Sequence, residues 1–139
     1  MDKVLGLSAI GFAAVFIAVG IAYGQSPADI ARTYEVAARQ EAPPFDGFSA
    51  QRGEQLFQST HGREWSCASC HTQNPRQPGT HAKTGQRIAP LAPAANGERF
   101  TSFDKAEKWF RRNCNDVVGR TCTAREKGDV LAYLMLVKP

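Results

Sequence analysis

The segment from Cys67 to His71 reads CASCH, and it constrains the fold of this chain more than any other feature. About one helical turn separates Cys67 from Cys70, so their thiols lie on one side of the chain. The spacing C-x-x-C-H is typical of covalent haem attachment, in which the thiols bond the two vinyl groups and the histidine ligates the iron. We therefore expect one haem c, anchored by Cys67 and Cys70, with His71 as the proximal ligand.

Two other chemistries use a pair of cysteines at this spacing. A thioredoxin-like redox pair requires a βαβ context, and the sequence contains no strand pattern. A zinc site requires two further ligands at a matching spacing, and none follows the motif. The histidine directly after Cys70 favours haem over both.

The N-terminus carries a long apolar run. Residues 4–23 contain no charge, follow a single lysine, and lead to small residues at Ala22 and Gly24. This pattern predicts that residues 1–24 are a signal peptide cleaved before Gln25, or an uncleaved N-terminal membrane anchor. In either case the remaining chain lies in the periplasm, where disulfides persist, either free or anchored to the inner membrane.

The charge balance excludes one class of partner. The chain has 17 Lys and Arg against 13 Asp and Glu, a net charge of +4. No basic run alternates with aromatic residues, so we expect no nucleic-acid partner.

Periodicity and capping residues predict an all-α protein. Helices are expected over about 26–40, 49–59, 102–113 and 123–137, with a long Pro- and Gly-rich loop over 72–97 and no strands. Gly53 and Phe57 on the second helix, and Leu131 and Tyr133 on the last, suit the crossed terminal helices of a class I cytochrome c fold. We therefore assign residues 25–48 to an N-terminal helical extension and residues 49–139 to the cytochrome c domain.

The sixth iron ligand is less evident, because no methionine occupies a suitable place. Met135 follows Leu134 in the middle of the last helix, where packing explains it. His61 and His81 lie ten residues before and after His71, and Lys83 is a weaker candidate. Pro90 could accept a hydrogen bond from the ring of His71, or simply be a loop proline.

Helical phase singles out one asparagine as another candidate. At 100° per residue, Asn113 shares the apolar face of Ala106 and Phe110, whereas Asn115 falls on the opposite side. The alternative is that Asn113 caps the C-terminus of its helix, as asparagine often does. Phase alone leaves both roles open.

Cys114 and Cys122 form the second cysteine pair. No histidine follows either residue, so neither is a haem anchor. In an exported protein a disulfide is favoured over two free thiols, and it would fix the backbone beside Asn113.

Residues 83–134, and above all the pattern RNCN…GR.C from Arg112 to Cys122, resemble the sphaeroides haem protein family of oxygen-binding class I cytochromes c. The resemblance implies that Asn113 is the sixth iron ligand and leaves on reduction, and that Cys114 and Cys122 form a disulfide. It also implies a ferrous haem that binds oxygen, nitric oxide or carbon monoxide, and a dihaem cytochrome c as redox partner. Residues 60–66 and 72–79 depart from the family pattern.

Three functions are compatible with these features. The first is a cytochrome that binds a diatomic ligand once it is reduced and exchanges electrons with a partner cytochrome or another redox protein. The second is a simple periplasmic electron carrier. The third is an enzyme acting on nitric oxide, oxygen or peroxide, which ranks last because no acid–base pair is evident beyond Asn113 and His81.

Overall fold

The structure, a computed structural model, describes residues 24–138. It contains five helices within that range: α1 (Pro27–Glu41), α2 (Ala50–Gln58), α3 (Cys67–His71), α4 (Phe103–Val117) and α5 (Ala124–Leu136). The predicted helical architecture is confirmed. The predicted signal peptide or anchor over residues 1–24 falls almost wholly outside the described residues. Within residues 24–138, no helix has both the length and the apolar character needed to cross a membrane.

The prediction that the chain has no strands is wrong in one place. Strands β1 (Gly79–Thr80) and β2 (Arg87–Ile88) pair antiparallel, with Gly79 opposite Ile88 and Thr80 opposite Arg87. Two residues are too few to produce an alternating pattern in the sequence. The pairing forms because the loop turns back on itself around His81, whose backbone N–H donates to the carbonyl of Gln86 at 2.8 Å.

Local capping explains why the longer helices begin where they do. The Ser26 side chain accepts from the backbone of Asp29, and the Asp29 carboxylate accepts from the Ser26 N–H at 2.8 Å. Thr123 and Glu126 form the same reciprocal capping box at the start of α5. Each box satisfies two backbone N–H groups that a helix start would otherwise leave without partners.

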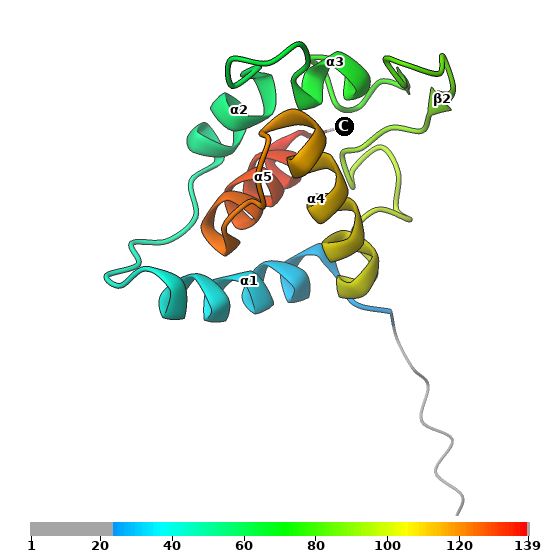
Figure 1. Cartoon of the computed structure of the whole chain (residues 1–139). Helices are drawn as coiled ribbons and strands as arrows, with labels where there is room; N and C mark the ends of the chain where they lie inside the picture. Colours follow the sequence, from blue (N-terminus) through cyan, green and yellow to red (C-terminus); the bar gives the residue numbers. More distant parts are fainter. Residues whose placement is uncertain (1–23, 139) are drawn as a thin grey trace, which may run out of the picture.

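Helix α5 lies at the centre of the fold, with α1 on one side and α2 on the other (Figure 1). The α2–α5 crossing depends on Gly53, where a Cβ atom would lie only 1.9 Å from the carbonyl oxygen of Asp129. The predicted close approach of these two helices is therefore confirmed. Asp129, only 3% exposed, fixes the crossing by accepting from the Ser49 N–H and the Arg52 guanidinium.

Two apolar clusters flank α5. The first joins α1, α4 and α5 through buried residues Ile30, Tyr34, Ala106 and Leu131. The second joins α2 and α5 and includes Phe57, Val130, Tyr133 and Leu134, with Cys67 and Ala68 of α3 packed against it. Phe100 and Phe110 touch both clusters, so the aromatic residues before and within α4 connect the two halves of the core.

Helix α4 extends one turn further than the sequence predicted. It continues through Asn113 to Val117, and Val118 is its C-cap. The Val118 N–H donates to the carbonyl of Cys114 at 2.8 Å, which keeps the last turn helical. Asn113 therefore lies inside the helix, and the alternative that it caps the C-terminus is wrong.

Candidate haem site

The CASCH segment folds into a single helical turn of its own. Ser66 is the N-cap of α3, and it exchanges capping hydrogen bonds with Ser69. Cys67 and Cys70 are free thiols, both partly buried. Burial raises the pKa of Cys67 to about 11, so its thiol stays protonated at neutral pH. The turn thus presents two unoxidised thiols and His71 from one short element, as haem attachment requires.

His71 projects from this turn toward the second apolar cluster. Its ring centroid lies 6.4 Å from that of Phe57. Burial, and secondly the positive charge of Arg99, lower the pKa of His71 to about 4. The imidazole is therefore neutral at physiological pH, which is the form that ligates iron.

Of the two roles considered for Pro90, the structure favours the loop proline, since no hydrogen bond joins His71 to Pro90 within residues 24–138. The Pro90 carbonyl accepts from Arg99 Nε at 2.9 Å and from Asn96 Nδ2 at 3.2 Å. A carbonyl oxygen has two lone pairs, and these two donors occupy both. Pro90 is thus held by its own loop.

Arg99 is a residue that sequence reasoning missed. Its guanidinium also donates to the Ala89 carbonyl at 2.7 Å, so one side chain holds the two carbonyls that precede Leu91. Partial burial lowers the pKa of Arg99, although the group stays charged. No sequence pattern marks it, because its partners are backbone atoms nine and ten residues earlier in the chain.

The β1–β2 hairpin closes over the haem-attachment turn. Gly79 is required there, since a Cβ atom would lie 1.9 Å from the Cys70 carbonyl oxygen. The Ala82 N–H donates to Cys70 Sγ at 3.3 Å, and the Lys83 ammonium lies 4.8 Å from the centroid of the Trp65 ring. Gly79, the last residue of one segment that departs from the family pattern, therefore packs against the turn itself.

Each histidine candidate for the sixth ligand has one ring nitrogen in contact with the backbone. His61 Nε2 lies 3.0 Å from the Leu56 carbonyl oxygen. His81 Nδ1 accepts from the N–H groups of Lys83 and Thr84, each at 3.3 Å. Met135 is 43% exposed at the surface of α5, in agreement with a packing or surface role.

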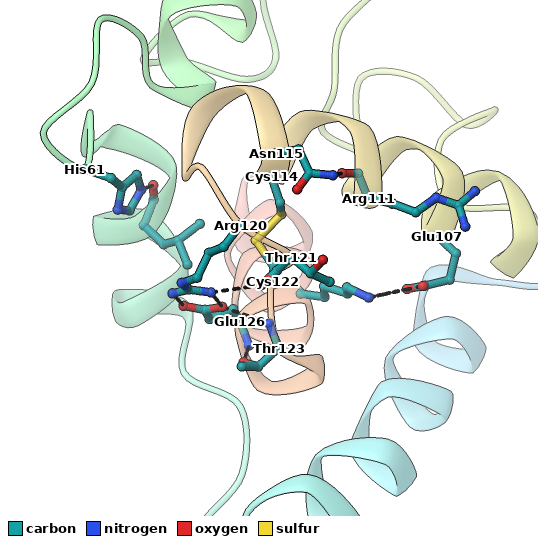
Figure 2. The surroundings of a disulfide bond; sticks show 12 residues. His61, Glu107, Arg111, Cys114, Asn115, Arg120, Thr121, Cys122, Thr123 and Glu126 are labelled. Carbon is teal, nitrogen blue, oxygen red and sulfur yellow. Dashed lines mark hydrogen bonds and ion pairs between the residues drawn. A yellow bond between two sulfur atoms is a disulfide. The ribbon is translucent and has the colours of Figure 1, made fainter.

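The two asparagines of α4 differ in what their side chains contact. Asn115 is exposed, and its Nδ2 donates to the Arg111 carbonyl at 2.8 Å, as Figure 2 shows. Asn113 is partly buried, and its amide has no hydrogen-bond partner among residues 24–138. It lies one turn after Phe110, which packs against both apolar clusters. Asn113 is therefore the asparagine whose amide is free to ligate a metal.

A disulfide joins Cys114 to Cys122, as predicted, and ties the last turns of α4 to the start of α5 (Figure 2). Both half-cystines are buried, at 5% and 3% exposure. The following turn is stabilised by Arg120, which forms an ion pair with Glu126 at 2.6 Å. The backbone directly after Asn113 is thus fixed by a covalent bond.

Comparison with known proteins identifies the family. Cytochrome c-type protein SHP of Cereibacter sphaeroides is 43% identical over 125 residues, which span 87% of this chain and 92% of the relative. The chain belongs to the SHP family of c-type cytochromes. The structure of oxidised SHP, an oxygen-binding cytochrome c, superposes with a TM-score of 0.70 and 43% identity, covering 80% of this chain and 96% of SHP. The class I cytochrome c fold follows.

A second relative of the SHP family is cytochrome c'' of Methylophilus methylotrophus, 36% identical over 128 residues that span 89% of each chain. Its oxidised crystal structure has a TM-score of 0.70 and 37% identity, covering 79% of this chain and 93% of that one. Its solution structure, studied for haem-ligand detachment, has a TM-score of 0.69 at 37% identity, covering 81% and 95%. A family model described as a domain of unknown function, DUF1924, matches residues 43–134, so the chain belongs to that family too.

The residues present fit haem c, the cofactor of this family. Two free thiols and a neutral histidine share one turn, and α4 carries Asn113, whose amide has no hydrogen-bond partner among residues 24–138. Helices α3 and α4 are not among the pairs that pack closely, whereas α2 packs closely against both α3 and α5. Residues 24–138 contain no cluster of three or more His, Cys, Asp or Glu side chains suited to a metal ion.

Proposed function

We propose that this chain is an exported monohaem cytochrome c in which Asn113 ligates ferric iron, leaves on reduction, and so opens a site for a diatomic ligand. The observation that carries the proposal is that the Asn113 amide has no hydrogen-bond partner among residues 24–138. The Asn115 amide, in contrast, donates to the Arg111 carbonyl of the same helix. Its relatives support it, since SHP binds oxygen and cytochrome c'' was studied for haem-ligand detachment.

In this proposal Cys67 and Cys70 hold haem c through two thioether bonds, and His71 is the proximal ligand. When bound, haem c supplies an iron that cycles between the ferric and ferrous states and takes up oxygen, nitric oxide or carbon monoxide. The amide oxygen of Asn113 is a hard, neutral donor, which suits ferric iron better than the softer ferrous ion. Reduction therefore weakens this bond more than it would weaken a bond to methionine.

The released side chain keeps a further role. The Asn113 NH₂ group carries two donors, and it stays within one residue of the disulfide that fixes its backbone. It can donate a hydrogen bond to a diatomic ligand on the same side of the haem. A dihaem cytochrome c or another redox protein would supply the electron that starts this sequence.

The proposed location is the periplasm, reached through the apolar N-terminal segment. We expect cleavage before Gln25, so that the mature chain is recovered in the periplasmic fraction with Gln25 at its N-terminus. Recovery of the intact chain in the membrane fraction would instead show an inner-membrane anchor.

The deciding experiment is the ferrous absorption spectrum with and without carbon monoxide. We expect a high-spin ferrous form that binds carbon monoxide rapidly. Asn113→Ala should give an open ferric site, whereas Asn115→Ala, the matched control two residues away, should leave the ferric spectrum unchanged. A ferrous protein that stays six-coordinate and low-spin would contradict the proposal, and the reverse result for the two variants would move the ligand to Asn115.

A further inference from the structure

The outer side of α4 carries an exposed stripe that the proposed ligand chemistry does not use. At 100° per residue, the stripe contains Lys105, Lys108, Trp109, Arg112 and Asp116, all of them exposed. We name Lys105, Lys108, Trp109 and Arg112 the basic face. Asp116 continues the stripe one turn later, so the stripe as a whole carries a net charge of +2.

The charges of the basic face are unpaired. None of its three cations lies within ion-pair distance of a carboxylate among residues 24–138, whereas six other basic side chains in that range form ion pairs. The six are Arg32, Arg39, Arg52, Arg120, Arg125 and Lys127. The positive charge on α4 is thus available to an external partner.

A large aromatic side chain lies in the middle of these cations. Trp109 is 51% exposed, although tryptophan is among the side chains that gain most from burial. The Arg112 guanidinium lies 5.8 Å from its ring centroid. An exposed aromatic residue surrounded by cations is typical of an interface centre with a charged rim, because tryptophan and arginine are enriched where binding energy concentrates.

The position of Trp109 relates this face to the candidate haem site. Asn113 follows it by four residues, one helical turn or about 6 Å along the axis of α4. In helical phase, Asn113 lies between Trp109 and the buried Ala106, so the basic face borders the partly buried side of α4 that carries Asn113. A protein seated on Trp109 is therefore within one turn of the proposed sixth ligand.

We infer that the basic face of α4 is the docking surface for an acidic redox protein that delivers electrons to this cytochrome. The inference rests on the proposed electron exchange and adds where, and through which charges, the partner binds. Complementary charge raises the encounter rate, and small, weakly bound interfaces are typical of electron-transfer pairs. Trp109 supplies the apolar centre of that interface.

Reduced flavodoxin, an acidic flavoprotein, is a suitable probe for stopped-flow reduction of the ferric holoprotein. The anionic flavin hydroquinone gives one electron to ferric iron and becomes the neutral semiquinone, and no proton is transferred. We expect the second-order rate constant to fall as salt rises, and Lys105→Glu/Arg112→Glu to lower it about tenfold or more at low salt. The matched control Arg32→Glu/Arg39→Glu changes the net charge equally on α1 and should have a much smaller effect.

A second measurement reports binding without electron transfer. The chain has two tryptophans, so its indole N–H groups give two NMR signals. Oxidised flavodoxin should shift the signal of exposed Trp109 and leave that of Trp65, which packs under Lys83, unchanged. Trp109→Ala should weaken this binding and keep the salt dependence of the rate.

Several results would overturn the inference. If the Arg32→Glu/Arg39→Glu control lowered the reduction rate as much as Lys105→Glu/Arg112→Glu, the effect would be one of net charge alone. If free reduced flavin also reduced the Lys105→Glu/Arg112→Glu variant more slowly, the substitutions would have changed the haem site. If flavodoxin shifted only the indole signal of Trp65, the partner would bind near the β1–β2 hairpin and not on the basic face. Binding to phosphatidylglycerol vesicles, with none to flavodoxin, would identify a membrane-binding face. Each is distinct from failure of the proposed ligand chemistry, which the carbon monoxide spectrum reports.

Discussion

The absence of one side-chain atom decides how closely α2 and α5 approach each other. At Gly53 there is no room for even a methyl group, because a Cβ atom would lie 1.9 Å from the Asp129 carbonyl oxygen and 2.8 Å from the Val130 nitrogen. Both obstacles are backbone atoms of α5, so they cannot turn aside as a flexible side chain would. The crossing that supports the haem-attachment turn thus depends on one glycine.

We expect Gly53→Ala to force α2 and α5 apart and to lower the free energy of unfolding by about 1–3 kcal/mol, the usual cost of overpacking. Chemical denaturation of the holoprotein would measure it. Gly97→Ala is the matched control, since a Cβ atom at Gly97 meets no atom within 4 Å. Equal stability of the two variants would contradict this view of the crossing.

Much of the candidate site could be predicted at the level of residues, because its chemistry depends on spacing. The CASCH turn follows from residue spacing, and helical phase predicts that Asn113, unlike the exposed Asn115, lies on a partly buried side of α4. Arg99 and Gly79 could not be found in this way. Each contacts backbone carbonyls of residues nine or ten positions earlier in the chain. Every residue type has a backbone carbonyl, so the sequence does not indicate which one is contacted.

At the scale of elements, the starts of the helices were predictable and one of their ends was not. Ser26 and Thr123 begin their helices through local capping boxes that the sequence displays. The end of α4 depends on tertiary structure instead. The disulfide holds the chain at Cys114, and α4 continues to Val117 past two asparagines that suggested an earlier stop.

The capping box of α5 should give stability a pH dependence. The Arg120 guanidinium holds the pKa of Glu126 below its ordinary value of 4.5. A carboxylate whose folded pKa is depressed stabilises the fold above its unfolded pKa, and this stability is lost as the pH falls through the folded value. The contribution of Glu126 is therefore complete above about pH 4.5 and decreases below it.

We expect Glu126→Gln to lower the free energy of unfolding at pH 7 by up to about 1 kcal/mol, since Arg120 is half exposed and solvent screens the pair. The difference from the unchanged protein should shrink as the pH falls below 4.5. Thr123→Ala, which removes the uncharged half of the box, should cost about 1 kcal/mol at both pH values. Urea unfolding at pH 7 and pH 3.5 separates the two, and a Glu126→Gln effect independent of pH would contradict this assignment.

At the scale of the whole molecule, the four cysteines serve two separate purposes. Cys67 and Cys70 lie on α3 and are not joined to each other, whereas Cys114 and Cys122 cross-link α4 to the segment just before α5. A chain of this size buries a limited core of its own, and a large apolar cofactor would add to it. In the proposed function, the first pair therefore governs cofactor content and the second governs the rigidity of α4.

Paired substitutions should separate these purposes. Cys67→Ala/Cys70→Ala should abolish covalent haem, measured by haem staining on a denaturing gel. Cys114→Ser/Cys122→Ser should keep the stain and lower the free energy of unfolding by about 2–3 kcal/mol, as expected for closing so short a loop. Loss of the stain in the second variant would show that the disulfide is needed for haem attachment.

The course of α4 beyond Asn113 limits how the proposed ligand can move. The helix runs a further turn after this residue, and the next residue is bonded to Cys122. Unwinding the backbone to withdraw the amide would break that turn and pull against a buried cross-link. Withdrawal is therefore restricted to rotation about the two side-chain torsions of Asn113. Side chains change rotamer within picoseconds to nanoseconds where they are free, so opening the site would not wait on a slow rearrangement of the fold.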